Sequence, residues 1–293
     1  MIRNINYSTK TVINDVFIKF YKYMVILKNK FFPNIKLKNS LFKYITIKLM
    51  NSKLSFTKTE LGTKLFLDKN DSLSLSFNKV YECKEVELLK KIIKQNSNII
   101  DIGANIGYYT TFFSLTASKG NVFGFEPEIS NLKLLKKNIR TNKCSNITLF
   151  ENSVGEICCE SKLYLSDDNS GDHRCYSLSQ KEYKVQKIKQ INLDSINFNC
   201  KIDLIKIDIQ GYEYKAFKGM IKLIKNNRPT IMSEFWPHAI KLSGERPIDF
   251  LNFFHDLKYD IFDVNKNLLI QNNQFKRLCS SKRNDMNLLM VTK

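Results

Sequence analysis

The stretch Ser97–Thr110, SNIIDIGANIGYYT, decides the fold class of this 293-residue chain. It begins with β-branched isoleucines around Asp101, which is typical of a strand buried on both faces. Gly103 and Gly107 then predict a turn, because glycine accepts backbone conformations that a Cβ atom hinders. A helix is expected to begin after Gly107, with unpaired N–H groups in its first turn. A strand, a glycine turn and a helix in this order favour an α/β fold.

The alternation of strand and helix continues along the chain. The predicted strands are Asn121–Phe125, Ile147–Phe150, Ile202–Ile207 and Thr230–Met232, and the predicted helices are Glu82–Gln95, Ser130–Arg140 and Tyr212–Lys225. Within Leu54–Tyr81, the alternation of Leu73, Leu75 and Phe77 with serines predicts a β-hairpin. We expect one Rossmann-like domain over residues 56–293, with a doubly wound, mostly parallel sheet covered by helices on both faces.

Composition limits the class of protein. No run of about 18 apolar residues and no secretory signal pattern is present, so we expect neither a spanning helix nor export. The seven cysteines have no C-x-x-C pair and no framework spacing, which favours reduced thiols in a cytoplasmic protein. The formal net charge of +19 favours anionic partners, although a joint richness in Lys, Asn and Ile also reflects a coding sequence poor in G and C.

Residues 1–55 form a basic segment that carries eleven Lys or Arg against one acid, Asp15. Apolar residues three or four apart between Lys10 and Phe32 predict an amphipathic helix with a basic side, and Pro33 is expected to end it. Such a helix either lies peripherally on an anionic membrane or packs against the rest of the chain or a second copy. Residues 1–55 are therefore expected to form an N-terminal helical extension in one of these two arrangements.

The glycine spacing indicates the kind of ligand that the first turn would bind. The spacing is G-x-x-x-G, whereas dinucleotide sites use G-x-G-x-x-G, whose middle glycine lets a pyrophosphate lie against the backbone. Asp101 just before the turn favours a ligand with a cationic amine. S-adenosylmethionine fits that description, and a strand, turn and helix without a ligand is the alternative.

Polar residues at the ends of the next two strands extend the predicted site. Glu126 ends the second strand 23 residues after Gly103, where an acid is expected to accept both hydroxyls of a ribose. Asn152 follows the third strand, where an adenine edge would be read. Because parallel strands end at one edge of a sheet, these residues are expected to share a crevice.

Further acids follow the fourth and fifth predicted strands. Asp208 and Glu213 come after the fourth strand, and Glu234 ends the fifth. In so basic a chain, an acidic crevice indicates a cationic ligand or a metal ion. The alternative is that Asp208 and Glu213 only cap and order the helix that follows.

Four separated motifs carry a family resemblance: DIGANIGYYT, FEP, LIKIDIQGYEYKAFKG and IMSE, within Tyr81–Val264. On these motifs the chain resembles the FkbM family of S-adenosylmethionine-dependent methyltransferases. The resemblance implies a seven-stranded doubly wound sheet with an antiparallel last strand, and methyl transfer to a hydroxyl. The cofactor contacts that it implies are at Asp101, Gly103, Asn105, Gly107 and Glu126. Gln210 departs from the family pattern, which commonly has an acid there, and residues 1–55 lie outside it.

The sequence thus predicts an S-adenosylmethionine-dependent O-methyltransferase acting on a sugar, a glycan or another hydroxylated metabolite. Removing the hydroxyl proton needs a base, for which the candidates are Asp208, Glu234 and His173 of the polar loop SDDNSGDHRCY. We expect no resident metal ion, and the alternative is Mg²⁺ held by Asp208 and Glu234.

Two other functions are compatible with the charge. A nucleic-acid methyltransferase is one, but no Asp/Asn-Pro-Pro-aromatic run and no Pro-Cys nucleophile follows a strand, so a nucleic-acid partner is not expected. A non-enzymatic basic membrane adaptor on the same scaffold is the other, and the intact cofactor residues oppose it.

Overall fold

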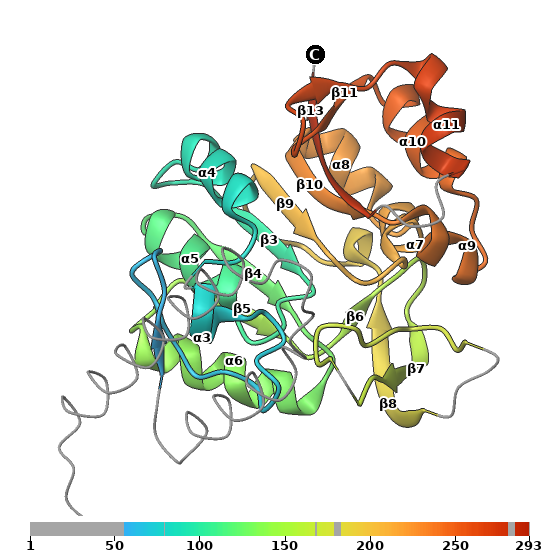
Figure 1. Cartoon of the computed structure of the whole chain (residues 1–293). Helices are drawn as coiled ribbons and strands as arrows, with labels where there is room; N and C mark the ends of the chain where they lie inside the picture. The colour runs from blue at the N-terminus through green and yellow to red at the C-terminus, as the bar shows by residue number, and fades with distance from the viewer. Residues whose placement is uncertain (1–55, 79, 168, 179–182, 281–284, 293) are drawn as a thin grey trace, which may run out of the picture.

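The computed structural model describes residues 56–78, 80–167, 169–178, 183–280 and 285–292. Its largest element is an eight-stranded sheet in the order β12-β11-β13-β10-β9-β3-β4-β5 (Figure 1). The strands are β3 Ile99–Ile102, β4 Val122–Phe125, β5 Ile147–Phe150, β9 Leu204–Ile207, β10 Thr230–Phe235, β11 Tyr259–Asp263, β12 Leu268–Leu269 and β13 Met286–Thr292. The pairs from β5 through β10 are parallel, and β13 runs antiparallel to both of its neighbours. The predicted doubly wound sheet with an antiparallel last strand is confirmed, and the short β12 adds an eighth strand at the edge.

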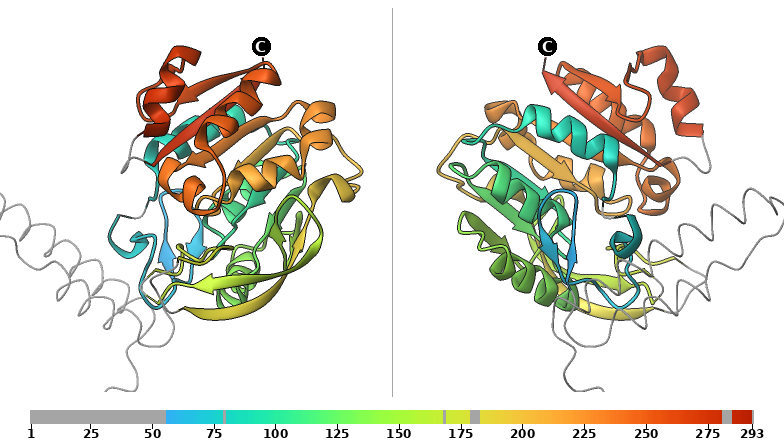
Figure 2. Two further views of the ribbon diagram at one scale, coloured as in Figure 1. Left: turned by 90° about the vertical axis from the view of Figure 1, so that its right-hand side faces the viewer. Right: turned by 60° about the vertical axis from the view of Figure 1, so that its left-hand side comes forward.

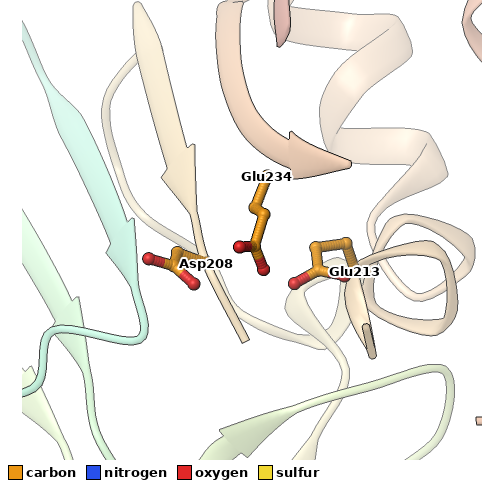
Figure 3. A group of neighbouring side chains, drawn as sticks. All are labelled: Asp208, Glu213 and Glu234. Carbon is orange, nitrogen blue, oxygen red and sulfur yellow. The ribbon is translucent and has the colours of Figure 1, made fainter. Parts of the chain in front are cut away.

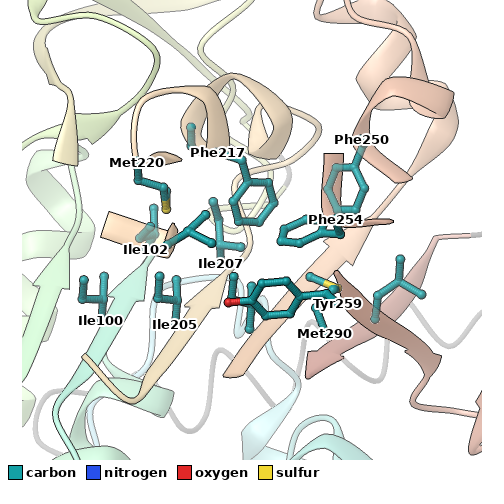
Figure 4. Close-up of a cluster of buried hydrophobic side chains, with 14 of the residues drawn as sticks. Ile100, Ile102, Ile205, Ile207, Phe217, Met220, Phe250, Phe254, Tyr259 and Met290 are labelled. Carbon is teal, nitrogen blue, oxygen red and sulfur yellow. The ribbon is translucent and has the colours of Figure 1, made fainter. Parts of the chain in front are cut away.

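Helices cover both faces of this sheet. They are α4 Cys83–Ile92, α5 Tyr108–Thr116, α6 Ile129–Thr141, α7 Glu213–Lys218, α8 Ile221–Asn227, α9 Pro237–Leu242, α10 Pro247–Asp256 and α11 Phe275–Ser280. The first apolar cluster joins α7, α8 and α10 to the sheet residues Ile100 and Ile205, with Phe217 and Phe254 stacked edge to face at 4.8 Å (Figure 4). The second joins α4 and α5 to the opposite face through Ile99. Neighbouring isoleucines of β3 enter different clusters because successive side chains of a strand point to opposite faces.

A smaller three-stranded sheet lies beside the carboxyl ends of the parallel strands (Figure 1). It consists of β6 Ser153–Val154, β7 Cys159–Leu165 and β8 Lys184–Ile191, in the order β6-β8-β7. The sequence predicted only a polar loop in this region. In β8, Ile188 and Gln190 are buried while the lysines between and before them are exposed, so a period-two pattern is present among charged residues.

The hairpin before α4 is shorter than predicted. Strands β1 Thr57–Lys58 and β2 Lys64–Leu65 pair antiparallel and lie with α4 and α5 on one side of the large sheet (Figure 2, right). The strand expected around Leu73, Leu75 and Phe77 is wrong, because α3 Leu75–Asn78 forms a helical turn there. Its cause is local: Asp71 Oδ1 accepts the Leu75 N–H at 2.9 Å, a bond that starts a helix and that alternation does not reveal.

The helix predicted over Tyr212–Lys225 is two helices, α7 and α8. The break lies at Gly219, where a Cβ atom would overlap with the carbonyl oxygen of Gly155. The carboxylate of Asp194 accepts the N–H groups of Lys222 at 3.0 Å and Leu223 at 2.8 Å, and so satisfies the start of α8. A distant side chain therefore begins the second helix.

Among the described residues, no helix is both long and apolar enough to cross a bilayer. The amphipathic helix predicted between Lys10 and Phe32, and its contact with a membrane or with the rest of the chain, lie outside the described residues.

Candidate functional site

The turn between β3 and α5 is held against both neighbouring strands. The N–H groups of Gly103 and Ala104 both donate to the carbonyl oxygen of Phe125 at the end of β4, each at 3.0 Å. On the other side, a Cβ at Gly103 would overlap with the carbonyl oxygen of Asp208 after β9, and the φ of Gly103 is +83°. Glycine is therefore required here by a close approach of backbone and by a left-handed conformation.

Glu126 is fixed at the end of β4 by the same turn. Its Oε2 accepts the Asn105 N–H and its Oε1 accepts the Glu128 N–H, both at 2.8 Å. The residue is 5% exposed, and burial raises the pKa of its carboxyl to about 7. Each carboxylate oxygen retains a lone pair for a further donor.

A cavity of about 70 Å³ lies at this edge of the sheet. Its lining includes six of the residues proposed from the sequence: Gly103, Asn105, Glu126, Asn152, His173 and Asp208. Ser170, Gly171 and Cys175, from the segment between β7 and β8, line it as well, so this segment covers the cavity. Asp101, Gly107 and Glu234 are not among the lining residues.

Asp101 and Gly107 lie deeper in the fold than the sequence suggested. Asp101 is fully buried, and its Oδ2 accepts the hydroxyl of Thr110 at 2.6 Å. At Gly107 a Cβ atom would come within 2.5 Å of Leu135 Cδ1, so its absence lets α6 pack against the turn. Both residues shape the turn from behind, whereas Gly103 and Asn105 face the cavity.

Three carboxylates meet at the carboxyl ends of β9 and β10. Asp208, Glu213 and Glu234, here called the acidic cluster, each have one carboxylate oxygen within 4.8 Å of the others, and Glu234 lies between the other two (Figure 3). Burial, followed by repulsion from the two neighbouring carboxylates, raises the pKa of Glu234 well above its usual value. Burial raises the pKa of Glu213 to about 7. Asp208 belongs both to this cluster and to the cavity lining.

A buried lysine that the sequence analysis did not single out lies behind the cluster. Lys206 is 6% exposed, and its Nζ is 3.5 Å from Asp208 Oδ2 and 4.8 Å from the centre of the Tyr109 ring. Burial alone would lower the pKa of Lys206, but the carboxylates of Asp208, Asp101 and Glu82 raise it. The sequence feature that could have revealed Lys206 is a charged residue inside the buried strand LIKI, because an unpaired charge buried there costs too much free energy to occur.

His173 lines the cavity from the segment between β7 and β8. Its Nδ1 accepts the Ser166 N–H at 3.0 Å, and the charges that act on it are those of Glu128, Asp172 and Asp68. Burial lowers the pKa of this imidazole. The structure thus brings Asp208 and Glu234 together and places His173 apart from them, with Nε2 as its remaining nitrogen.

The segment between β7 and β8 that covers the cavity is anchored on the third motif, LIKIDIQGYEYKAFKG. Tyr176 donates its hydroxyl to the carbonyl oxygen of Gln210 at 2.7 Å. Arg174, 8% exposed, pairs with Asp172 at 2.7 Å and lies 5.1 Å from the Trp236 ring. Gln210 itself donates from Nε2 to Asp208 Oδ1 at 3.0 Å. The side chain that departs from the family pattern therefore contacts the acid shared by the cavity and the cluster.

The sequence motifs that form this site match a known protein family. The family model described as the methyltransferase FkbM domain matches residues 101–261, which include every motif of the site. The chain belongs to this family.

Individual relatives of the FkbM-domain chain are distant. It is 24% identical over 147 residues to a hexuronic acid methyltransferase of Haloferax volcanii, covering 48% of this chain and 57% of the relative. It is 21% identical over 146 residues to methyltransferase 1 of Beauveria bassiana, covering 43% and 59%. The match thus spans less than two thirds of these curated relatives. A solved FkbM methyltransferase from Methylobacillus flagellatus shares 20% identity, with 68% of this chain and 44% of that chain covered and a TM-score of 0.43.

Proposed function

We propose that this FkbM-domain protein transfers the methyl group of S-adenosylmethionine to a hydroxyl of a sugar, a glycan or another small metabolite. The observation that carries the proposal is the shared cavity: a glycine turn, the fixed carboxylate of Glu126 and the acid Asp208 line one space at the strand ends. Ligands of open α/β sheets bind at this edge.

The chemistry of the lining suits the proposed cofactor. Glu126 offers carboxylate lone pairs to two ribose hydroxyls, each a charge-assisted bond. Among the described residues, Asn105 Oδ1 is buried without a donor, although Asn105 lines the cavity. A ligand N–H or O–H group that donates to Asn105 Oδ1 would remove the free-energy cost of burying this oxygen unpaired. Asn152 also lines the cavity, and we assign it to the adenine edge.

The segment between β7 and β8 that covers the cavity must move for a cofactor to enter. The cavity holds about 70 Å³, whereas sites for small organic ligands span roughly 300–1,000 Å³. The strand ends are tied together by backbone bonds, so the segment bearing Ser170, Gly171 and His173 is the part expected to shift outward.

The acidic cluster lies where the methyl acceptor would bind. S-adenosylmethionine supplies an electrophilic methyl group, so the protein must align the acceptor and remove its proton. Alignment of two reactants contributes about 7–11 kcal/mol, and a positioned base about 10²- to 10⁴-fold in rate. Asp208 and Glu234 are proposed to receive the hydroxyl proton, and the pKa of Glu234, raised by burial, favours that role. His173 lines the cavity from the segment between β7 and β8 and is the alternative base.

The substrate class rests on one relative. The Haloferax volcanii relative is a hexuronic acid methyltransferase, and we extend sugar hydroxyls to this chain on that likeness. A net charge of +19 also suits an acidic sugar. An uncharged hydroxylated metabolite and nucleic acid are the competing acceptors in the test below.

The first experiment measures cofactor binding by calorimetry on the full chain. S-adenosylmethionine and its demethylated product should bind, and Glu126→Ala should weaken both by about 3 kcal/mol or more, because two charge-assisted bonds of about 1.5–3 kcal/mol each are lost. Glu87→Gln, an exposed acid on α4, serves as the matched control and should bind like the wild type. Tight NAD binding without S-adenosylmethionine binding would contradict the assignment.

The second experiment identifies the acceptor. Radiolabelled S-adenosylmethionine is offered with uronic acids, neutral sugars and RNA, and label should enter a sugar hydroxyl in an alkali-stable ether. Label in RNA alone would replace the sugar proposal with a nucleic-acid methyltransferase.

A further inference from the structure

We propose that the acidic cluster of Asp208, Glu213 and Glu234 binds a divalent metal ion that holds the acceptor hydroxyl. The inference rests on the proposed function for its role and on the geometry of the cluster for its existence.

The spacing of the carboxylates fits one cation. Their ligand oxygens all lie within 4.8 Å of one another. Opposite ligands of Ca²⁺, at about 2.3–2.6 Å from the ion, are separated by about 4.6–5.2 Å, and those of Mg²⁺ by about 4.2 Å. Oxygens no more than 4.8 Å apart therefore lie within the span of ligands around one calcium-sized ion.

Hydrogen bonds from backbone N–H groups hold the Glu213 carboxylate in place. It is 0% exposed, and its Oε1 accepts the N–H groups of Ile209 at 2.9 Å and Gly211 at 3.2 Å, which fixes the side chain. Its Oε2 is buried and has no donor within the described part of the chain. Figure 3 shows the carboxylate directed toward Glu234, whose buried Oε2 also lacks a donor among the described residues. Each of these two neighbouring carboxylates therefore keeps a buried oxygen that can bind a cation.

The charge balance favours a divalent ion. Lys206 pairs with Asp208, so one negative charge of the cluster has a cation beside it. Neither Glu213 nor Glu234 forms an ion pair with a Lys or Arg in the described ranges. Glu82 and Asp285 add negative potential at Glu234. A 2+ ion neutralises the two carboxylates that lack a partner and so offsets the free-energy cost of burying them in the ionised form.

The position of the ion connects it to methyl transfer. Asp208 belongs to both the cluster and the cavity, so an ion in the cluster lies beside the proposed cofactor pocket. A hydroxyl bound to such an ion would lose its proton more readily, and the oxygen of Asp208 or Glu234 that does not bind the ion would receive it. Acceptors with two neighbouring hydroxyls, as in sugars, would supply two ligands to the ion.

The competing explanation is that the carboxylates share protons. Buried like charges at this distance exist without a metal ion when one or more of them is protonated. In that case the cluster binds no divalent ion, and the two explanations differ in a direct binding measurement.

The test is calorimetric titration of chelator-treated full chain with MnCl₂, CaCl₂ and MgCl₂, supported by the electron paramagnetic resonance signal of bound Mn²⁺. The wild type should bind one ion, and Glu234→Gln should weaken the binding at least tenfold while S-adenosylmethionine affinity changes less than twofold. Glu87→Gln is the control and should bind ions like the wild type. Asp208→Asn should also weaken ion binding, which guards against a folding defect in a single variant.

The outcomes separate this inference from the proposed function. No ion binding by the wild type, or undiminished binding by both Glu234→Gln and Asp208→Asn, overturns the metal site whether or not the cofactor binds. Ion binding without S-adenosylmethionine binding retains the metal site and refutes the methyltransferase proposal.

Discussion

Glu126 is the residue on which the candidate cofactor site depends most. Its two oxygens already accept backbone N–H groups, and these bonds orient the carboxylate rather than saturate it. Burial makes ionisation of the Glu126 carboxyl costly and raises its pKa to about 7. The charge of this carboxyl near neutral pH therefore controls which ligands it binds.

We predict that S-adenosylmethionine affinity rises with pH through about 7. Burial raises the pKa of Glu126 to about 7, and only the ionised carboxylate is acceptor-only toward two ribose hydroxyls. Between pH 6 and 8 the ionised fraction, and with it the affinity, should increase about tenfold. Calorimetry at these two pH values measures it, and a Glu126→Gln chain should show weak, pH-independent binding. An equal slope in wild type and variant would assign the effect to another group.

The same pKa shift has a consequence for stability. Because the folded-state pKa lies above the unfolded value of 4.5, the folded chain binds the proton more tightly than the unfolded chain. The contribution of Glu126 to stability is therefore fully present below pH 4.5 and is lost as pH rises to about 7. Denaturation of Glu126→Gln should show the variant gaining stability relative to the ligand-free wild type between pH 5 and 8. A constant difference over that window would refute the shifted pKa.

Gly103 and Gly62 form a matched pair for a stability test. Both have a left-handed φ, +83° and +81°, but a Cβ at Gly62 meets no atom within 4 Å while one at Gly103 overlaps with the Asp208 carbonyl oxygen. Gly62→Ala should cost about 1–2 kcal/mol from conformation alone, and Gly103→Ala clearly more. The free energy of unfolding from urea titration decides this. Equal losses would show that the clash is relieved without cost.

At the scale of elements, α6 joins the N-terminal hairpin to the glycine turn through one side chain. Asn138 is fully buried; its Nδ2 donates to the carbonyl oxygens of Phe66 at 3.1 Å and Ile106 at 2.7 Å, and its Oδ1 accepts the Phe66 N–H at 2.7 Å. The hairpin therefore supports the site from behind without lining the cavity.

We predict that Asn138→Ala destabilises the fold by about 2–4 kcal/mol, because it leaves buried backbone groups without partners. Lys133→Ala, an exposed position on the same helix, should change stability by less than about 0.5 kcal/mol. Chemical denaturation compares the two. If Asn138→Ala matched Lys133→Ala, water would be replacing the lost bonds.

At the scale of the molecule, the described residues contain the sheet, the cavity and the acidic cluster, while residues 1–55 hold eleven of the basic side chains. We infer that deleting residues 1–55 leaves a folded chain that binds S-adenosylmethionine but no longer sediments with anionic vesicles. Each lysine near such a surface contributes about 1 kcal/mol, screened within about 8 Å at physiological salt, so full-length binding should fall steeply as salt rises. A truncated chain that aggregates or loses cofactor binding would show that the segment packs on the domain or on a second copy.

The sequence by itself determined the α/β class, the parallel strands and the acids at their ends. These features follow from local signals: a strand buried on both faces must be an apolar run, and a left-handed turn requires glycine at Gly103. Hydrophobic periodicity failed in two places. At α3, a short-range bond to Asp71 starts a helical turn where alternation predicted a strand. At Gly219, the distant Asp194 starts α8 where one continuous helix was predicted.

Only the tertiary structure decided which side chains meet. The strand order β10-β9-β3 pairs Lys206 with Asp101 across neighbouring strands, and it brings Glu234 of β10 beside Asp208 and Glu213. It also showed that Gly107 makes room for Leu135 and that a three-stranded sheet and its connecting segment cover the cavity. Such contacts join residues far apart in the chain, so their geometry depends on the packing of the whole sheet, which no local pattern encodes.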